Sequence, residues 1–252
     1  MSNDYNSLGK YDVGLKGDFC YMKCVIGVLG GMGTFATIHM FQQYAEIFTA
    51  QKEWERPRII IDNRCTMPSR VRAFLYNENV GQLVDEMTDS LQYFLNAGCN
   101  KIILACNTSH LFLPLIYKRI PELKGVIVDI IIACVQKVAA DNVKRVFLLA
   151  SEGTIDSKIY NNALLSKNIE CVVPTKNEYF NIRKCIEAVK QNDYSKEVKE
   201  IFLELVNRYD ACILGCTELP VLYSKYIDEA SGNRIYDPLC IALQAIHSDF
   251  MG

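Results

Sequence analysis

KIILACNTSH (residues 101–110) and DACILGCTELP (residues 210–220) are two copies of one pattern, and this pattern decides the fold. Each copy is an apolar run rich in β-branched residues, followed by a small residue, a cysteine and polar residues that include threonine. Cys106 and Cys216 should therefore lie where a buried strand gives way to a loop or helix, which is where α/β folds place reactive groups. One such cysteine in each half of the chain predicts two thiols that face each other across a cleft.

Size and composition favour a folded domain that stays inside the cell. The chain has 252 residues, half of them apolar, and a formal net charge of −2 without a basic stripe, so nucleic acid is not an expected partner. Its 11 cysteines are scattered through apolar patterns, which indicates reduced thiols rather than a disulfide framework. The N-terminus lacks the apolar core of a signal peptide, and the longest apolar stretch, 125–135, is interrupted by Asp129. We expect a cytoplasmic protein that does not bind membranes.

From residue 23 onward, short β-branched runs alternate with helical patterns, which predicts α/β architecture with mostly parallel sheets and helices on both faces. The strands are expected at Cys24–Leu29, Arg58–Asp62, Lys101–Ala105, Val126–Ile130, Arg145–Ala150, Glu170–Val173, Ala211–Leu214 and Arg234–Tyr236. Helices are expected between most of them, for example at Gln82–Ala97, Ile155–Ser166 and Ser195–Arg208.

Because the two cysteine segments lie about half a chain apart, we infer two similar lobes with the site in the cleft between them. Residues 23–122 would form the first lobe and residues 123–234 the second. Residues 235–252 would cross back to complete the first lobe. Residues 1–22 are polar and glycine-rich, and we expect them to form a mobile N-terminal extension.

A glycine turn, GVLGGMGTFAT at Gly27–Thr37, lies between a predicted strand and a predicted helix. Gly31, Gly33 and Ala36 match the G-x-G-x-x-A pattern of dinucleotide-binding folds, with Asp62 at the end of the next strand, although Asp62 follows later than the roughly 20 residues usual there. The alternative is an anion site, in which free N–H groups at the helix start bind a substrate carboxylate.

Two further chemistries compete for the cysteines. Cys20–Cys24 and Cys212–Cys216 are both C-x3-C pairs, a spacing that fits structural zinc poorly. His110, four residues after Cys106, could be the base of a cysteine hydrolase, or it could orient the loop.

GGMGTFAT, ACNTSH and GCTELP, in this order, resemble the aspartate/glutamate racemase superfamily, and the resemblance extends from Lys23 over nearly the whole chain. GCTEL is similar to the aspartate racemase branch, because cell-wall glutamate racemases typically carry His where this chain has Glu218. The resemblance implies a pseudo-symmetric two-lobed fold, an active site between the lobes, and activity without pyridoxal phosphate, another cofactor or a metal.

The resemblance also implies roles for individual residues. Cys106 and Cys216 would be the two acid/base thiols. CTMPSRVR resembles the segment whose Arg contacts substrate, which maps to Arg70, with Arg72 as a competitor, and EAVKQND resembles the segment that supplies Lys190. Arg70 or Lys190 could instead be ordinary solvated surface charges. Ser69 replaces the usual acidic residue and Asp62–Arg64 replaces Asn-Asn-Pro, so we expect a broader substrate range than that of a strict aspartate enzyme.

In the implied mechanism, one thiolate removes the α-proton of an amino acid and the other thiol returns a proton from the opposite face. The expected partner is a small acidic amino acid, aspartate first and glutamate second, and we expect a homodimer. A relative that runs another isomerisation or a decarboxylation, and a non-catalytic amino-acid-binding protein, are the alternatives. The substrate-binding candidates are Met32, Gly33, Thr34, Asn107, Thr108 and Thr217 around the α-carboxylate, with Arg70 and Lys190 at the side-chain carboxylate.

Overall fold

The computed structural model describes residues 24–230 and 232–251, so the extension predicted for residues 1–22 lies outside the described residues. The first sheet has the strand order β2-β1-β3, and both pairings are parallel. Its strands are β1 (Val25–Gly30), β2 (Arg58–Asn63) and β3 (Lys101–Leu104). The helices of this half are α1 (Thr34–Ile47), α2 (Arg70–Tyr76), α3 (Val80–Asn96) and α4 (Leu113–Arg119), with short 3-10 turns at Glu53–Glu55, Thr108–Phe112 and Pro121–Gly125.

The second sheet has the order β5-β4-β6-β7 and is also parallel throughout. Its strands are β4 (Arg145–Leu149), β5 (Glu170–Val172), β6 (Ala211–Leu214) and β7 (Arg234–Tyr236). The remaining helices are α5 (Ile130–Ala140), α6 (Glu152–Asp156), α7 (Ile159–Leu165), α8 (Lys176–Lys190), α9 (Lys196–Asn207), α10 (Leu219–Tyr226) and α11 (Pro238–Met251), with a 3-10 turn at Ile227–Glu229. Two parallel sheets with helices on both sides confirm the predicted fold class.

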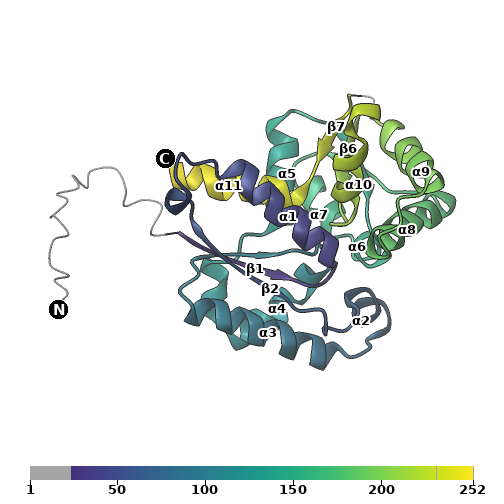
Figure 1. Ribbon diagram of the computed structural model, residues 1–252. Helices are drawn as coiled ribbons and strands as arrows, with labels where there is room; N and C mark the ends of the chain where they lie inside the picture. The colour runs from purple at the N-terminus through teal and green to yellow at the C-terminus, as the bar shows by residue number, and fades with distance from the viewer. Residues whose placement is uncertain (1–23, 231, 252) are drawn as a thin grey trace, which may run out of the picture.

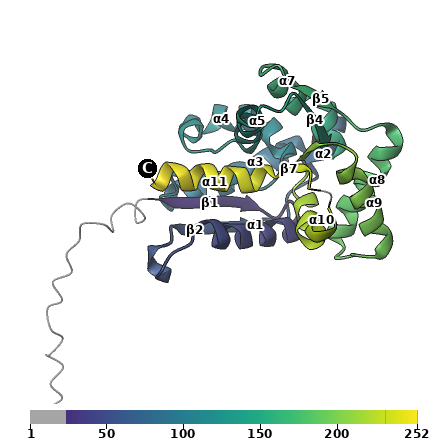
Figure 2. The same ribbon diagram turned by 90° about the horizontal axis from the view of Figure 1, so that it is seen from above.

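The inner faces of the two sheets share one apolar core. Val28 and Ile103 of the first sheet and Leu148 and Ile213 of the second belong to the same buried cluster, together with residues of α1, α5, α7 and α11. Figure 1 shows α1 and α11 running together above the first sheet, and α11 also packs on α5. Each outer face has a core of its own, covered by α3 and α4 on the first sheet and by α8 and α9 on the second. Figure 2 gives the same arrangement from above.

Three local expectations need correction. Strand β7 pairs with β6 from Ala211↔Arg234 to Ile213↔Tyr236, so residues 235–236 lie in the second sheet instead of crossing back, while α11 packs on α1 and α5. The strand expected at Val126–Ile130 is reduced to one bridge, Ile102↔Ile127, because the Asp129 side chain accepts from Ile131 N and Ile132 N and thereby starts α5. The helix expected over residues 155–166 is interrupted by Lys158, whose φ is +55°. The division into two lobes, with this shifted boundary, stays a proposal.

Within residues 24–230 and 232–251, no helix is both long enough and apolar enough to cross a membrane.

Candidate active site

A cavity of about 290 Å³ lies where the carboxyl ends of β1 and β3 meet those of β4 and β6. Parallel strands bring their carboxyl ends to one edge, so residues from both halves of the chain converge there. Helices α2 and α6 are in contact, which joins the two halves beside this opening. The cavity is lined by Met32, Ser69, Arg70, Val71, Arg72, Tyr76, Cys106, Asn107, Thr108, Ala150, Ser151, Glu152, Tyr179, Arg183, Ile186, Glu187, Lys190, Gly215, Cys216, Thr217 and Glu218.

Both predicted thiols line this cavity. Cys106 follows β3 and Cys216 follows β6, and both are partly buried free cysteines. The electrostatic interaction with Cys106 is one of the influences that raise the pKa of the Cys216 thiol. The repeated strand-cysteine pattern therefore does bring one thiol from each half into a common pocket.

The Cys216 thiol donates a hydrogen bond of 3.0 Å to Glu218 Oε2, and the Glu218 side chain is itself buried. Burial is the main reason that the pKa of Cys216 lies well above the usual 9.0, and the charge and hydrogen bond of Glu218 raise it further. Lys190 acts in the opposite direction on this thiol. Burial on its own lowers the pKa of Lys190, but Glu218, Glu187 and Cys216 together reverse this, so that the net shift is upward.

Gly33, predicted to bind substrate through its backbone, does not line the cavity, and neither does Thr34. A Cβ atom on Gly33 would lie 2.3 Å from Glu218 Oε1, so the glycine leaves the space that the buried carboxylate occupies. The Thr34 hydroxyl lies 3.4 Å from the Cys65 thiol and accepts from Asn63 Nδ2 at 3.2 Å. Met32 is the part of the predicted glycine turn that reaches the cavity.

Polar residues after the two cysteines join the halves beneath the cavity. The Thr217 hydroxyl donates to Ala105 O at 3.3 Å, and the Thr108 hydroxyl lies 3.1 Å from Ser151 Oγ and 2.9 Å from Thr154 Oγ1. Asn107 differs from both threonines, because its Oδ1 accepts from the Tyr160 hydroxyl at 2.6 Å while its buried Nδ2 has no partner among the described residues.

Arg70 lines the cavity and is fixed by backbone oxygens. Its Nη2 donates to Met32 O and its Nη1 to Pro68 O, each at 3.0 Å. Its Nε is buried without a partner within the part of the chain that the structure describes. The guanidinium is therefore held at the cavity wall with its Nε donor unused. The competitor, Arg72, is paired instead with Glu78, through bonds of 2.6 and 2.7 Å.

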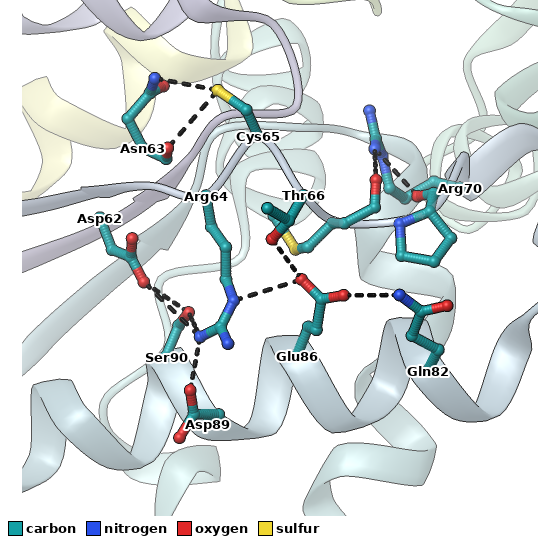
Figure 3. Close-up of polar contacts among 12 residues, drawn as sticks. Asp62, Asn63, Arg64, Cys65, Thr66, Arg70, Gln82, Glu86, Asp89 and Ser90 are labelled. Atoms are coloured by element: carbon teal, nitrogen blue, oxygen red, sulfur yellow. Dashed lines mark hydrogen bonds and ion pairs between the residues drawn. The ribbon is translucent and has the colours of Figure 1, made fainter.

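The loop that leads to Arg70 is anchored on α3, as Figure 3 shows. Arg64 Nη1 donates to Asp89 Oδ2 at 2.6 Å and to Ser90 Oγ at 2.9 Å, and its Nε lies 3.4 Å from Glu86 Oε2. Asp62 accepts from Ser90 Oγ at 2.6 Å.

These contacts argue against the dinucleotide alternative. The Asp62 carboxylate, which would have to bind the ribose of a dinucleotide, accepts a hydrogen bond from Ser90 of α3 and does not line the cavity. A Cβ on Gly31, whose φ is +77°, would meet the Arg64 backbone at 2.3 Å. Close packing of this loop therefore explains the glycine turn without a pyrophosphate.

His110 is not arranged as a base for Cys106. Its Nδ1 donates to the Cys106 backbone oxygen at 3.0 Å, and burial lowers its pKa, so the neutral ring orients the loop. The Cys212 thiol donates to Val206 O, away from Cys216. No group of three or more His, Cys, Asp or Glu residues in the described parts of the chain is placed to hold a metal ion.

A family model for Asp/Glu/hydantoin racemases matches residues 29–246, which is most of the chain. This chain belongs to the Asp/Glu/hydantoin racemase family. The resemblance drawn from the three motifs is thereby confirmed. Members of the family and its solved structural neighbours are racemases, which are isomerases, so the predicted enzyme class is confirmed as well.

Solved racemases share the fold. The aspartate racemase of Picrophilus torridus superposes with a TM-score of 0.73 at 25% identity, covering 89% of this chain and 94% of that one. An aspartate racemase homologue from Pyrococcus horikoshii gives a TM-score of 0.70 at 23% identity, over 92% of this chain and 100% of that one. By sequence, a glutamate racemase of Campylobacter jejuni is 27% identical over 146 residues, which are 56% of this chain and 58% of that enzyme.

Several residues that line the cavity were not predicted from the sequence. Arg183 and Glu187 precede Lys190 on α8 at spacings that place all three on one helix face, a periodicity that could have found them. Glu152 and Tyr179 give no such signal, because they come from separate elements and meet only in the fold, where hydrogen bonding to Glu152 adds to the burial that raises the pKa of Tyr179.

Proposed function

We propose that this racemase-family enzyme interconverts the L and D forms of an acidic amino acid, aspartate first and glutamate second. It would do so by proton transfer between Cys106 and Cys216, without pyridoxal phosphate or metal. The observation that carries the proposal is the pairing of the Cys216 thiol with the buried Glu218 carboxylate, in the same cavity as a second thiol. A binding protein would need neither thiol, and two thiols in one cavity favour racemisation over a reaction that uses one.

The charge state of Cys216 suits one direction of the reaction. With its pKa raised, this thiol is protonated at neutral pH and can donate a proton to the α-carbon. Cys106, as the thiolate, would take the α-proton from the other face. One C–H bond and the Cys216 S–H bond break, while a new C–H bond and the Cys106 S–H bond form. In the opposite direction, Cys216 as the thiolate would take the α-proton and Cys106 as the thiol would return one, so that the Cys106 S–H bond breaks and the Cys216 S–H bond forms. The charge of Lys190 favours the Cys216 thiolate.

The weak acidity of the α-carbon makes the substrate-binding donors important. General acid–base placement typically contributes about 10²–10⁴-fold, so electrostatic stabilisation of the carbanion-like state must supply most of the rest. The buried, unpartnered Asn107 Nδ2 is the donor that we assign to the α-carboxylate. The hydroxyls of Thr108 and Thr217 would act chiefly by holding the two halves together.

Arg70 and Lys190 are the cations that we assign to the side-chain carboxylate. Arg70 has an unused donor, Nε, and Lys190 lies within the electrostatic reach of Glu218 and Cys216. Both line the cavity, as the assignment requires. Arg183 also lines the cavity and adds positive charge on the same helix as Lys190, which favours an anionic side chain in the substrate.

The test is α-proton exchange in D₂O. Chelator-treated protein is incubated with L- and D-aspartate, glutamate, alanine and serine, and loss of the α-proton is followed by NMR together with the enantiomer ratio. We expect exchange and racemisation with aspartate, and loss of both after iodoacetamide unless substrate protects. Exchange with none of the eight compounds, or activity that returns only when a metal or pyridoxal phosphate is added, would overturn the proposal.

A further inference from the structure

The floor of the cavity contains a hydrogen-bond donor whose direction is set from the other half of the chain. Asn107 follows β3, is 2% exposed and lines the cavity, and its Nδ2 has no acceptor among the residues described. Its Oδ1 accepts from the hydroxyl of Tyr160 on α7, at 2.6 Å. An unpaired buried amide is costly, so its retention at a cavity wall points to an acceptor that arrives with a ligand.

The hydrogen-bonding needs of Tyr160 select one of the two amide orientations. The phenol has a single hydrogen and is fully buried, and Asn107 Oδ1 is the acceptor that the structure gives it. If the amide were turned over, its NH₂ group would face the phenol oxygen. The phenol hydrogen and Oδ1 would then both lose their partners. The hydrogen bond from Tyr160 therefore directs Nδ2 away from the phenol.

Tyr160 is itself held rigidly. It is the largest side chain in the shared apolar core that is completely buried, and it does not line the cavity. Burial keeps its pKa well above the ordinary value of 10.0, so the phenol stays a neutral donor. The Tyr160 hydroxyl therefore connects to the cavity through its hydrogen bond to Asn107.

We propose that Tyr160 is a positioning residue, which holds the Asn107 amide with Nδ2 ready to donate to the α-carboxylate of the substrate. This inference rests on the proposed function, because it deepens the assignment of Asn107. Without the phenol hydroxyl, the amide can rotate and present Oδ1, an acceptor that repels a carboxylate. Each bound carboxylate then has to select the productive orientation.

The test is a double-mutant cycle on binding and turnover. Tyr160→Phe, Asn107→Ala and the double variant are compared with wild type by calorimetric Kd for aspartate and by kcat/KM. We expect Asn107→Ala to raise Kd about tenfold, since a hydrogen bond to a charged group contributes roughly a factor of ten or more. Tyr160→Phe should raise Kd about twofold or more, because only the fraction of protein whose freed amide presents Nδ2 can bind the carboxylate. In the Asn107→Ala background, the same change should have no further effect on Kd. An unchanged Kd in Tyr160→Phe, or an equal rise in both backgrounds, would overturn the proposal.

Tyr44→Phe is the matched control. Tyr44 is also a buried tyrosine of the shared core, and its hydroxyl donates to the backbone oxygen of Pro57, away from the cavity. It should lose stability in the same way as Tyr160→Phe and keep the wild-type Kd. If Tyr160→Phe does not fold, Asn107→Asp takes its place, because it keeps an acceptor for Tyr160 and removes the NH₂ donor. Its Kd should rise at least tenfold, and an unchanged Kd would refute the inference.

The outcomes separate this inference from the proposed function. Aspartate binding that depends on Tyr160 through Asn107, without racemisation in wild type, would support the positioning role and overturn the racemase assignment. Racemisation that is indifferent to Tyr160 would do the reverse. Wild-type protein that does not bind aspartate would overturn both.

Discussion

Cys216 and Glu218 form a thiol–carboxylate hydrogen bond of 3.0 Å across a single intervening residue, at the point where β6 passes into α10. The carboxylate is 3% exposed and sits in the space left by Gly33, which lies at the start of α1 in the other half of the chain. The pKa of the Cys216 thiol thus depends on the packing of Glu218 against Gly33, two residues that are remote in sequence.

Removal of either thiol should abolish racemisation. In Cys106→Ala and in Cys216→Ala, one face of the α-carbon has no acid or base, so we expect both directions to stop while the fold survives. Enantiomer ratios measured by chiral chromatography, with circular dichroism as the folding control, provide the check. Cys240→Ala is a suitable comparison, since Cys240 lies outside this cavity. Turnover near the wild-type rate in either cavity variant would exclude the two-thiol mechanism.

Replacement of the Glu218 carboxylate should make Cys216 easier to ionise. A negative neighbour raises a thiol pKa, so Glu218→Gln removes two of the influences that raise it and leaves burial, the largest. The pH at which Cys216 is half-alkylated by iodoacetamide should fall below the wild-type value and stay above 9.0, the usual thiol pKa. Mass spectrometry of the Cys216 peptide measures this, and exposed Cys65 in the same sample is the reference. A shift to higher pH would contradict the assignment.

Substitution of Gly33 by alanine should displace the Glu218 carboxylate. The added Cβ would lie 2.3 Å from Oε1, so we expect Gly33→Ala to lower kcat at least tenfold and to change the alkylation profile of Cys216. Gly81→Ala is the matched control, because a Cβ there meets nothing within 4 Å. Gly81 lies in α3, where alanine should stabilise the helix by up to about 1 kcal/mol. Equal activity in both alanine variants would refute the role given to Gly33.

Arg70→Lys should impair turnover of acidic substrates more than a surface change would. A lysine keeps the charge, but it cannot donate to Met32 O and Pro68 O while also offering a planar edge to a carboxylate. We expect kcat/KM for aspartate to fall about tenfold or more, in line with the loss of a hydrogen bond to a charged group. Wild type and variant are compared on aspartate, glutamate, alanine and serine. If alanine matches aspartate in wild type and the variant slows all four alike, Arg70 does not bind the side-chain carboxylate.

Loss of the Arg64 anchor should reduce stability modestly. Arg64→Gln removes the bonds to Asp89 and Ser90 and leaves Glu86, whose side chain is only 16% exposed, without its cation. We expect a loss of about 1 kcal/mol in the free energy of unfolding, measured in urea. Arg119→Gln is the control, because Arg119 of α4 pairs with Asp85 on the same helix α3. This pair is more exposed and should contribute less than about 0.5 kcal/mol. Equal losses in the two variants would show that the network adds nothing beyond an ordinary surface pair.

The strands and the meeting of the two cysteines could be predicted from the sequence, because local patterns control them. The strands that end at Cys106 and Cys216 follow from apolar runs closed by polar residues, and parallel pairing then brings the two cysteines to a common edge. The role of Arg64 could not be found in this way. The departure of Arg64 from the family pattern suggested altered specificity, whereas its guanidinium binds acidic residues of α3. These residues lie next to the loop only after folding, so no local pattern reveals the contact.

The same limit applies to Gly33 and Tyr160. A glycine before a helix indicates free backbone N–H groups in any sequence, and only the fold reveals the carboxylate packed against this one. Tyr160 looks like an ordinary core residue of a helix, and its hydroxyl acquires a role because Asn107 approaches it from the other half of the chain. Such contacts depend on tertiary packing, which periodicity does not encode.

The apolar core shared by the two sheets has a consequence for dissection of the chain. Because β1, β3, β4, β6 and α11 contribute to one buried cluster, a fragment that ends near residue 122 would expose an entire sheet face to solvent, and so would its complement. Neither fragment should persist as a soluble monomer. Co-expressed, however, the two should reassemble through that common face, so the protein is a natural candidate for a split reporter whose signal is the recovery of its own cavity.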